Sequence, residues 1–202
     1  MLIQSSSPMT AVTAVTAISY SLIYAALKPY TEKARLYISV INSFYLSTLA
    51  IQTFSLAIPK YHSPALAEYI IGYFTADLLL GHVFDRKNLN VLTGYIHHSA
   101  FICLIWHVRT TNETNLIYMF LPFEIPTLLL DLTRLHKIKA LDYSFGASFF
   151  ACRIIYNIHI INALLESHAH YAVIATALLF LHLHWFTGWL KRLNTESNKR
   201  LA

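Results

Sequence analysis

Apolar residues in this chain gather into seven stretches, separated by short segments rich in Lys, Arg, Asn and Pro. The stretches lie at about 11–27, 37–58, 66–84, 91–108, 115–132, 144–165 and 171–190. Each approaches the ~20 residues that a helix needs to cross a bilayer. The alternating ten-residue segments of a membrane barrel do not occur, so helices must satisfy the backbone. The pattern therefore predicts an all-α, polytopic transmembrane helical bundle of about seven spans.

Composition supports this class. Of the 202 residues, 56% are apolar and only 12% are charged, which is too apolar for an ordinary soluble domain. The two cysteines, Cys103 and Cys152, both fall within apolar stretches. We expect them to pack as small hydrophobic side chains, with no disulfide framework.

The distribution of Lys and Arg predicts the orientation, because basic residues stay on the cytoplasmic side. The opposite side holds only Lys60 and Arg109. Twelve bases follow the odd-numbered stretches: Lys28, Lys33, Arg35, Arg86, Lys87, Arg134, Lys137, Lys139, Lys191, Arg192, Lys199 and Arg200. The N-terminus is thus expected on the lumenal or exterior side and the C-terminus in the cytosol. This asymmetry also explains the net charge of +5 without a nucleic-acid partner.

Several ionisable residues lie inside the apolar stretches, where an unpaired charge is costly and is retained for a partner or a function. With ~1.5 Å of rise per helical residue, they all fall roughly 10–15 Å below the cytosolic boundary. They are Asp77, His97, His98, Glu124, Arg153, His182 and His184. One interpretation is that such groups have a purely structural role and hold helices together. Their convergence in one layer favours a functional cavity that opens to the cytosol.

The fifth stretch contains Pro122 and Pro126, each of which removes an internal helical hydrogen bond. We therefore expect a kink around Glu124. Glu124, Thr127 and Asp131 recur at helical spacing and predict a polar stripe on one face of this helix.

Five short segments together resemble one known family. They are the acid at Asp77, the HH at 97 and 98, FEIPT at 123–127, FFACR at 149–153 and HWF at 184–186. In this order they are similar to the TLC domain shared by TRAM, Lag1-type ceramide synthases and CLN8. The resemblance implies a six-helix core over 36–193, preceded by an N-terminal helix and basic cytosolic loop at 1–35 and followed by a cytosolic tail at 194–202. It also implies a role in lipid metabolism, including sphingolipids, in the endoplasmic reticulum.

The chain departs from the ceramide synthase motif at several positions. The Thr expected after HH is missing, Phe123 replaces a His, and Thr127 stands where a further Asp would be, while Glu124 and Asp131 keep acids at two places. The homeobox-like segment of many ceramide synthases is absent. The chain therefore looks more like the smaller TLC domain-containing proteins.

Two functions of different classes follow. As an acyltransferase, the protein would use His97 or His98 as base or acyl acceptor, oriented by Asp77 or Glu124, with acyl-CoA as co-substrate and no bound cofactor. Substrate would be held by Arg153, Thr127, Asp131, His182 and His184. As a lipid-binding, sensing or transport factor, the same layer would bind a headgroup without chemistry.

Other features bear on partners and location. The histidine spacing lacks the repeated boxes of a membrane di-iron enzyme, so no metal is expected. Membrane lipids are the expected partners, and the oligomeric state stays open. Residues 199–202, KRLA, are similar to a dibasic retrieval signal of the endoplasmic reticulum.

Overall fold

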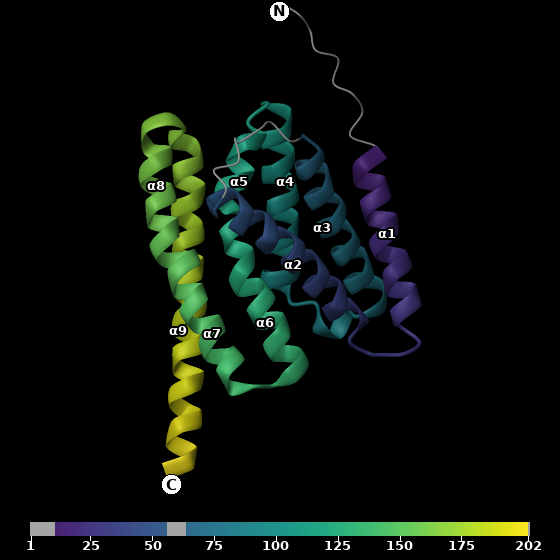
Figure 1. Cartoon of the computed structure of the whole chain (residues 1–202), viewed down its shortest axis with the longest axis vertical. Coiled ribbons are helices and arrows are strands. Elements are labelled where there is room, and N and C mark those ends of the chain that lie inside the picture. The colour runs from purple at the N-terminus through teal and green to yellow at the C-terminus, as the bar shows by residue number, and fades with distance from the viewer. Residues whose placement is uncertain (1–10, 56–63, 202) are drawn as a thin grey trace, which may run out of the picture. The chain divides into compact units, whose positions relative to one another are not determined.

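A computed structural model describes residues 11–55 and 64–201, and helix is the only regular secondary structure within these ranges. The α-helices are α1 (Ala11–Leu27), α2 (Ala34–Ser55), α3 (Pro64–Phe84), α4 (His97–Thr110), α5 (Ile117–Phe120), α6 (Glu124–His136), α7 (Lys139–Phe149), α8 (Tyr156–Ser167) and α9 (Ala169–Leu201) (Figure 1). Three short 3₁₀ turns are η1 (Arg86–Asn88), η3 (Thr114–Leu116) and η4 (Leu121–Phe123). Two π-helical turns are η2 (Val91–Ile96) and η5 (Phe150–Ile155). The predicted all-α class is confirmed.

Each predicted apolar stretch overlaps one helix or one continuous run of helical turns. The predicted end of the second stretch, at 58, lies outside the described residues. Four helical segments are long and apolar enough to cross a membrane, namely Ala34–Thr53, Thr114–His136, Lys139–Ser167 and Ala169–Thr195. Ala11–Leu27 is a shorter apolar helix. The chain is therefore an all-helical protein with four candidate membrane-spanning helices in the part that the structure describes.

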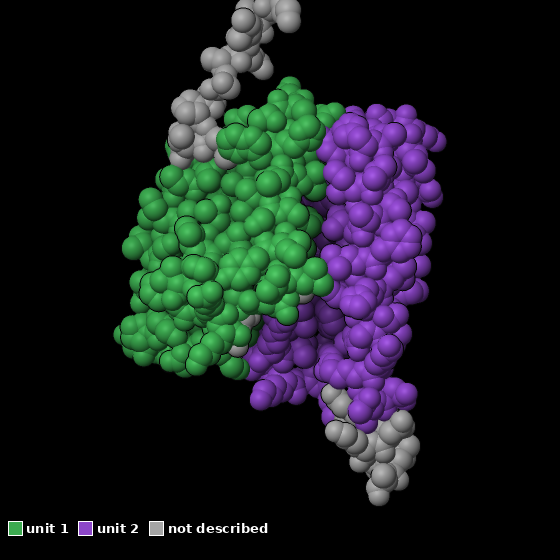
Figure 2. Space-filling model, turned by 180° about the vertical axis from the view of Figure 1, so that it is seen from behind, with its two compact units in different colours: residues 1–42, 52–118 green, residues 43–51, 119–202 purple. Residues whose placement is uncertain are grey.

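The chain divides into two compact units, which Figure 2 colours separately. Unit 1 comprises residues 1–42 and 52–118, and unit 2 comprises residues 43–51 and 119–202. The division runs through the segment 36–193 that the family resemblance treats as one core. Each unit is described below by itself.

In unit 1, α1 packs along α3 through small and aromatic side chains. The Thr13 hydroxyl donates a hydrogen bond to the Glu68 carbonyl at 3.2 Å, and the hydroxyls of Tyr20 and Tyr69 are hydrogen-bonded to each other. Nearer the end of both helices, the rings of Tyr24 and Phe84 stack with centroids 5.4 Å apart. The contacts advance along both helices together, so α1 and α3 run parallel.

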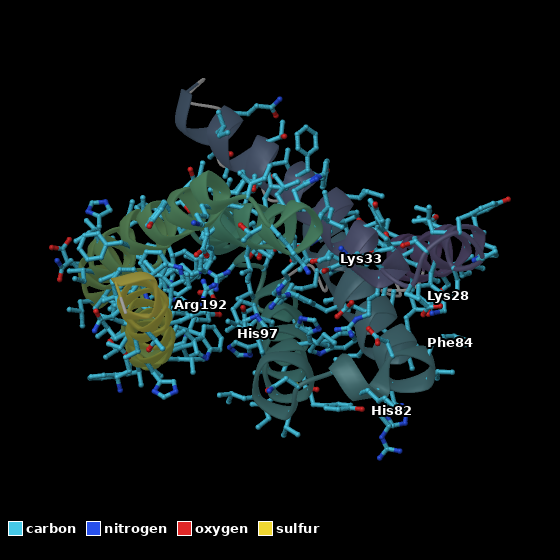
Figure 3. All side chains as sticks on the ribbon, turned by 90° about the horizontal axis from the view of Figure 1, so that it is seen from below. Lys28, Lys33, His82, Phe84, His97 and Arg192 are labelled. Carbon is cyan, nitrogen blue, oxygen red and sulfur yellow. The ribbon has the colours of Figure 1, made fainter. Side chains whose placement is uncertain are left out.

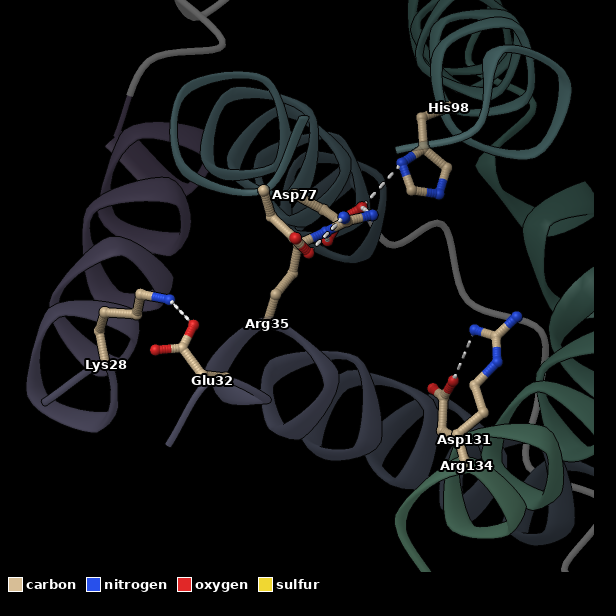
Figure 4. Close-up of polar contacts among 8 residues, drawn as sticks. Lys28, Glu32, Arg35, Asp77, His98, Asp131 and Arg134 are labelled. Carbon is tan, nitrogen blue, oxygen red and sulfur yellow. Dashed lines mark hydrogen bonds and ion pairs between the residues drawn. The ribbon is translucent and has the colours of Figure 1, made fainter. Parts of the chain in front are cut away.

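The turn after α1 is polar. Lys28 Nζ donates to Glu32 Oε2 at 2.7 Å (Figure 4), and this hydrogen bond raises the pKa of the Lys28 amine above its usual value. The pair is exposed, as expected for a connection outside the apolar spans.

In unit 2, α8 and α9 form an antiparallel pair joined by His168 alone. The fully buried Asn157 amide donates to the Ala175 carbonyl at 3.2 Å across this pair. At the other end of α9, Trp189 lies against Gly146 of α7, and its indole N–H donates to Asp142 Oδ1 at 3.2 Å. These polar ties fasten α9 to two helices of its own unit.

Replacing Gly72 by Ala is expected to destabilise the protein. A Cβ at Gly72 would lie 2.7 Å from the Thr13 carbonyl oxygen and 2.8 Å from Thr16 Cβ, so α1 and α3 would have to separate. Overpacking of this kind costs about 1–3 kcal/mol. Thermal unfolding of the purified protein in detergent measures the loss. The matched control is Gly188→Ala on α9, where a Cβ meets nothing within 4 Å. Equal melting temperatures for the two variants would contradict this packing.

Candidate functional site

Asp77, on α3, is the centre of a charged cluster in unit 1. Its carboxylate is buried, and Arg35 from the first turn of α2 grips it with two donors: Nε to Oδ1 at 2.9 Å and one terminal nitrogen to Oδ2 at 3.4 Å (Figure 4). The other terminal nitrogen of Arg35 donates to Asp85 Oδ2 at 3.2 Å. A planar guanidinium fork suits such bidentate recognition. Arg35, Asp77, Asp85 and His98 are called the Asp77 cluster below.

His98 approaches the same carboxylate from α4. Its Nδ1 lies 3.1 Å from Asp77 Oδ2, which is within ion-pair distance (Figure 4). The two atoms are not aligned as in a regular hydrogen bond. The imidazole rests against the Phe74 ring, with centroids 4.8 Å apart. Asp77 therefore contacts a cation on one side and an imidazole on the other.

His97 faces a different environment. Consecutive helical residues point about 100° apart, so the two histidine side chains leave the helix in different directions. The His97 ring lies 4.6 Å from the Phe101 ring and 6.4 Å from the Phe74 ring, measured between centroids (Figure 3 labels His97). Of the two predicted histidines, the structure brings His98 to Asp77.

The π turn η2 immediately precedes His97 and begins the helical run that continues as α4. A π turn holds one more residue than an α-helical turn, so it changes the rotational position of the residues that follow it by about 100°. At its start, the Asn90 side-chain oxygen accepts the Leu92 amide at 2.8 Å. Turns of this kind are often found at functional sites. Periodicity of apolar residues gives no sign of it.

A second polar cluster lies in unit 2, around Arg153. Its Nε and one terminal nitrogen both donate to the Phe123 carbonyl, at 3.0 and 2.8 Å, and the same terminal nitrogen reaches Thr127 Oγ1 at 2.7 Å. The Phe149 ring lies 5.3 Å from the guanidinium carbon. Phe123, Thr127, Arg153 and His182 are called the Arg153 cluster below.

Interruptions in two helices create this cluster. Pro122 lies in the 3₁₀ turn η4, which separates α5 from α6, and Phe123 ends that turn. The kink predicted from Pro122 and Pro126 thus takes the form of a tighter turn whose last carbonyl faces Arg153. Arg153 itself lies in the π turn η5.

His182 completes the cluster from α9. It is almost fully buried, and its Nδ1–H donates to the Arg153 backbone carbonyl at 3.0 Å. The imidazole also meets the Phe123 and Phe149 rings edge to face. Three predicted residues, Thr127, Arg153 and His182, are therefore brought together, and these contacts join η4, α6, η5 and α9.

The other predicted residues of unit 2 lie elsewhere. His184 is exposed on α9, two residues beyond His182 and so on another face of the helix. Asp131 is buried on α6, with Arg134 at 3.7 Å (Figure 4). Glu124 is half-buried at the first position of α6, directly after the Phe123 carbonyl that binds Arg153. A single layer that joins these residues to Asp77 and the histidines stays a prediction.

Members of three ion pairs are absent from the predicted candidates. Arg35 falls in a predicted loop, but α2 begins at Ala34 and places it on a helix. Glu68 and Arg109 pair at 3.2 Å between α3 and α4, close to the ends where charge is expected anyway. Asp142 accepts from Arg192 as well as from Trp189. Only the i, i+3 spacing of Trp189 and Arg192 hints at a shared partner.

Among the described residues, no group of three or more His, Cys, Asp or Glu side chains lies close enough to hold a metal ion. Comparison of the chain with protein-family models, curated proteins and solved structures finds no match. The function must therefore be argued from the two clusters themselves.

Arg153→Lys is expected to destabilise the protein by about 1.5–3 kcal/mol, because an ammonium cannot donate to the Phe123 carbonyl and Thr127 with the same fork. Arg134→Lys is the matched control, since the Arg134 side chain is 61% exposed. Its effect should stay within about 0.5 kcal/mol. Chemical unfolding in detergent compares the two variants. Equal stability would show that the Arg153 contacts do not fasten unit 2.

Proposed function

We propose that this protein is an integral membrane acyltransferase in which His98 acts as general base on the amine or hydroxyl of a membrane lipid, with acyl-CoA as the acyl donor. The observation that carries the proposal is the approach of His98 Nδ1 to the buried Asp77 carboxylate. A carboxylate beside Nδ1 favours the tautomer that carries its proton there and leaves Nε2 to take a proton, the arrangement that activates nucleophiles in many hydrolases and transferases.

The proposed step is balanced within the site and its two substrates. As the lipid nitrogen or oxygen bonds to the thioester carbonyl carbon, Nε2 takes its proton. The carbon–sulfur bond then breaks, and the imidazolium returns the proton to the CoA thiolate. Asp77 stabilises the imidazolium between these events, and no metal or redox group is required.

The resemblance to the TLC family supports the lipid substrate and an endoplasmic reticulum location, both of which we propose. We also propose seven spans, with the first at Ala11–Leu27, the N-terminus lumenal and the C-terminus cytosolic. The charge asymmetry of the loops supports this orientation. In unit 1 it would place the Asp77 cluster toward the cytosol, the side on which acyl-CoA is made.

An alternative is a lipid-binding or sensing role without chemistry. It is favoured by one observation: Arg35 and His98 together engage both oxygens of Asp77. A carboxylate with both oxygens engaged by protein partners could hold helices around a bound lipid rather than take part in a reaction.

Acyl transfer is tested with purified protein in lipid nanodiscs, palmitoyl-CoA, and either sphinganine or diacylglycerol as acceptor. Release of CoA and the acylated product are followed by absorbance and mass spectrometry. His98→Ala and Asp77→Asn should each lower kcat by about 10²–10⁴. His82→Ala is the control, because His82 is exposed and its Nδ1 contacts the Tyr95 hydroxyl instead.

Transfer that survives His98→Ala would overturn the assigned base. With no transfer to either acceptor, the enzymatic proposal fails. The alternative then predicts that native mass spectrometry finds a co-purified lipid that Asp77→Asn releases.

The proposed orientation is tested by cysteine labelling in a Cys103→Ser, Cys152→Ser background. Lys87 and Asn112 are both exposed, at opposite ends of the run η2 to α4. In sealed microsomes, an impermeant maleimide should label Lys87→Cys directly and Asn112→Cys only after detergent is added. The reverse order would invert the topology.

A further inference from the structure

We infer that Arg35 is a positioning residue for the Asp77–His98 pair: it holds the Asp77 carboxylate in place and balances its charge, beside the imidazole that accepts a proton in the proposed reaction. This inference rests on the proposed function, which it deepens. Arg35 lies outside the segment 36–193 that carries the family resemblance. Its role therefore follows only from the contacts of α2 with α3.

Three parts of unit 1 determine where the Arg35 side chain lies. α2 begins at Ala34, which is fully buried, so the Arg35 side chain leaves the first turn toward α3. On α3, Gly81 provides the room: a Cβ there would lie 3.1 Å from the guanidinium carbon of Arg35 and 3.1 Å from a Leu89 methyl carbon. Leu89 itself is buried after η1. The guanidinium thus occupies a fitted space between Gly81 and the two aspartates.

The two aspartates that Arg35 contacts differ in how exposed their side chains are. The Asp85 side chain is 26% exposed at the end of α3, whereas that of Asp77 is 5% exposed. A partly exposed carboxylate is stabilised by water, but a buried one depends on its partners. Arg35 therefore contributes most at Asp77, and Asp85 helps to hold the fork in place.

If Arg35 is removed, the buried Asp77 carboxylate loses its permanently charged partner and keeps the His98 imidazole beside it. An uncompensated carboxylate close to an imidazole favours the imidazolium, and an imidazolium cannot act as a base. Among the described residues of unit 1, Asp77 on α3 and His97 on α4 lie beside His98, and Arg35 on α2 lies on the other side of Asp77, where it also contacts Asp85. Of these, only Arg35 carries a permanent positive charge.

The test compares Arg35→Gln with Lys33→Gln, which removes an exposed base from the same connection. In the nanodisc assay, Arg35→Gln should lower kcat at neutral pH at least tenfold. It should also move the acid limb of the pH profile upward by about one unit or more. Lys33→Gln should leave both unchanged. Arg35→Lys should recover part of the loss, because it restores the charge without the fork.

A second measurement reads His98 without turnover. In protein with ¹⁵N-labelled histidine, the His98 signals are assigned by their absence from His98→Ala, and their charge state is followed by NMR against pH. Arg35→Gln should keep the imidazolium to higher pH. The double variant Arg35→Gln, Asp77→Asn should return His98 to the neutral form and recover folding if Arg35→Gln alone is unstable.

The outcomes separate the two proposals. If no acyl transfer is found but the His98 signals shift as described, the proposed enzyme is wrong and the role of Arg35 stands. If folded Arg35→Gln protein leaves both the His98 titration and the pH profile as in the parent protein, the inference about Arg35 is overturned.

Discussion

The need to neutralise a carboxylate inside apolar helices governs unit 1. Asp77 is buried on α3, and an isolated charge there would cost several kcal/mol. Its two partners arrive from the helices before and after α3, Arg35 from α2 and His98 from α4. The start of α2, the small residue at Gly81 and the π turn before His97 each serve these two contacts. One buried acid thus ties three helices together.

Unit 2 contains a buried cation, Arg153, which is bound by a backbone carbonyl instead of a carboxylate. Helical carbonyls are normally occupied by amides of the same helix, so they become available where the helix is interrupted. The 3₁₀ turn at Pro122 presents the Phe123 carbonyl to Arg153, and the π turn around Arg153 presents its own carbonyl to His182. Breaks in regular structure supply the acceptors that a buried Arg needs.

Helix positions and candidate residues could be predicted from the sequence, because apolar runs and isolated charges are visible in it. Asp77 with the histidine pair, and Arg153 with Thr127 and His182, are candidates on these grounds. The pairing of Asp77 with His98 rather than His97 could not be predicted. A π turn immediately precedes the two histidines and affects their rotational position, and the apolar composition gives no sign of it. Arg35 was missed for a related reason, since α2 begins before its apolar run does.

The π turn before the histidine pair also has a consequence for how robust the site is. If η2 relaxed to a regular α-helix, the residues after it would turn back by about 100°, and His97 would take the rotational position that His98 now holds. An imidazole would then still be presented on that side of the helix. Two adjacent histidines therefore keep an imidazole on that side of the helix even if the helix slips by a single residue.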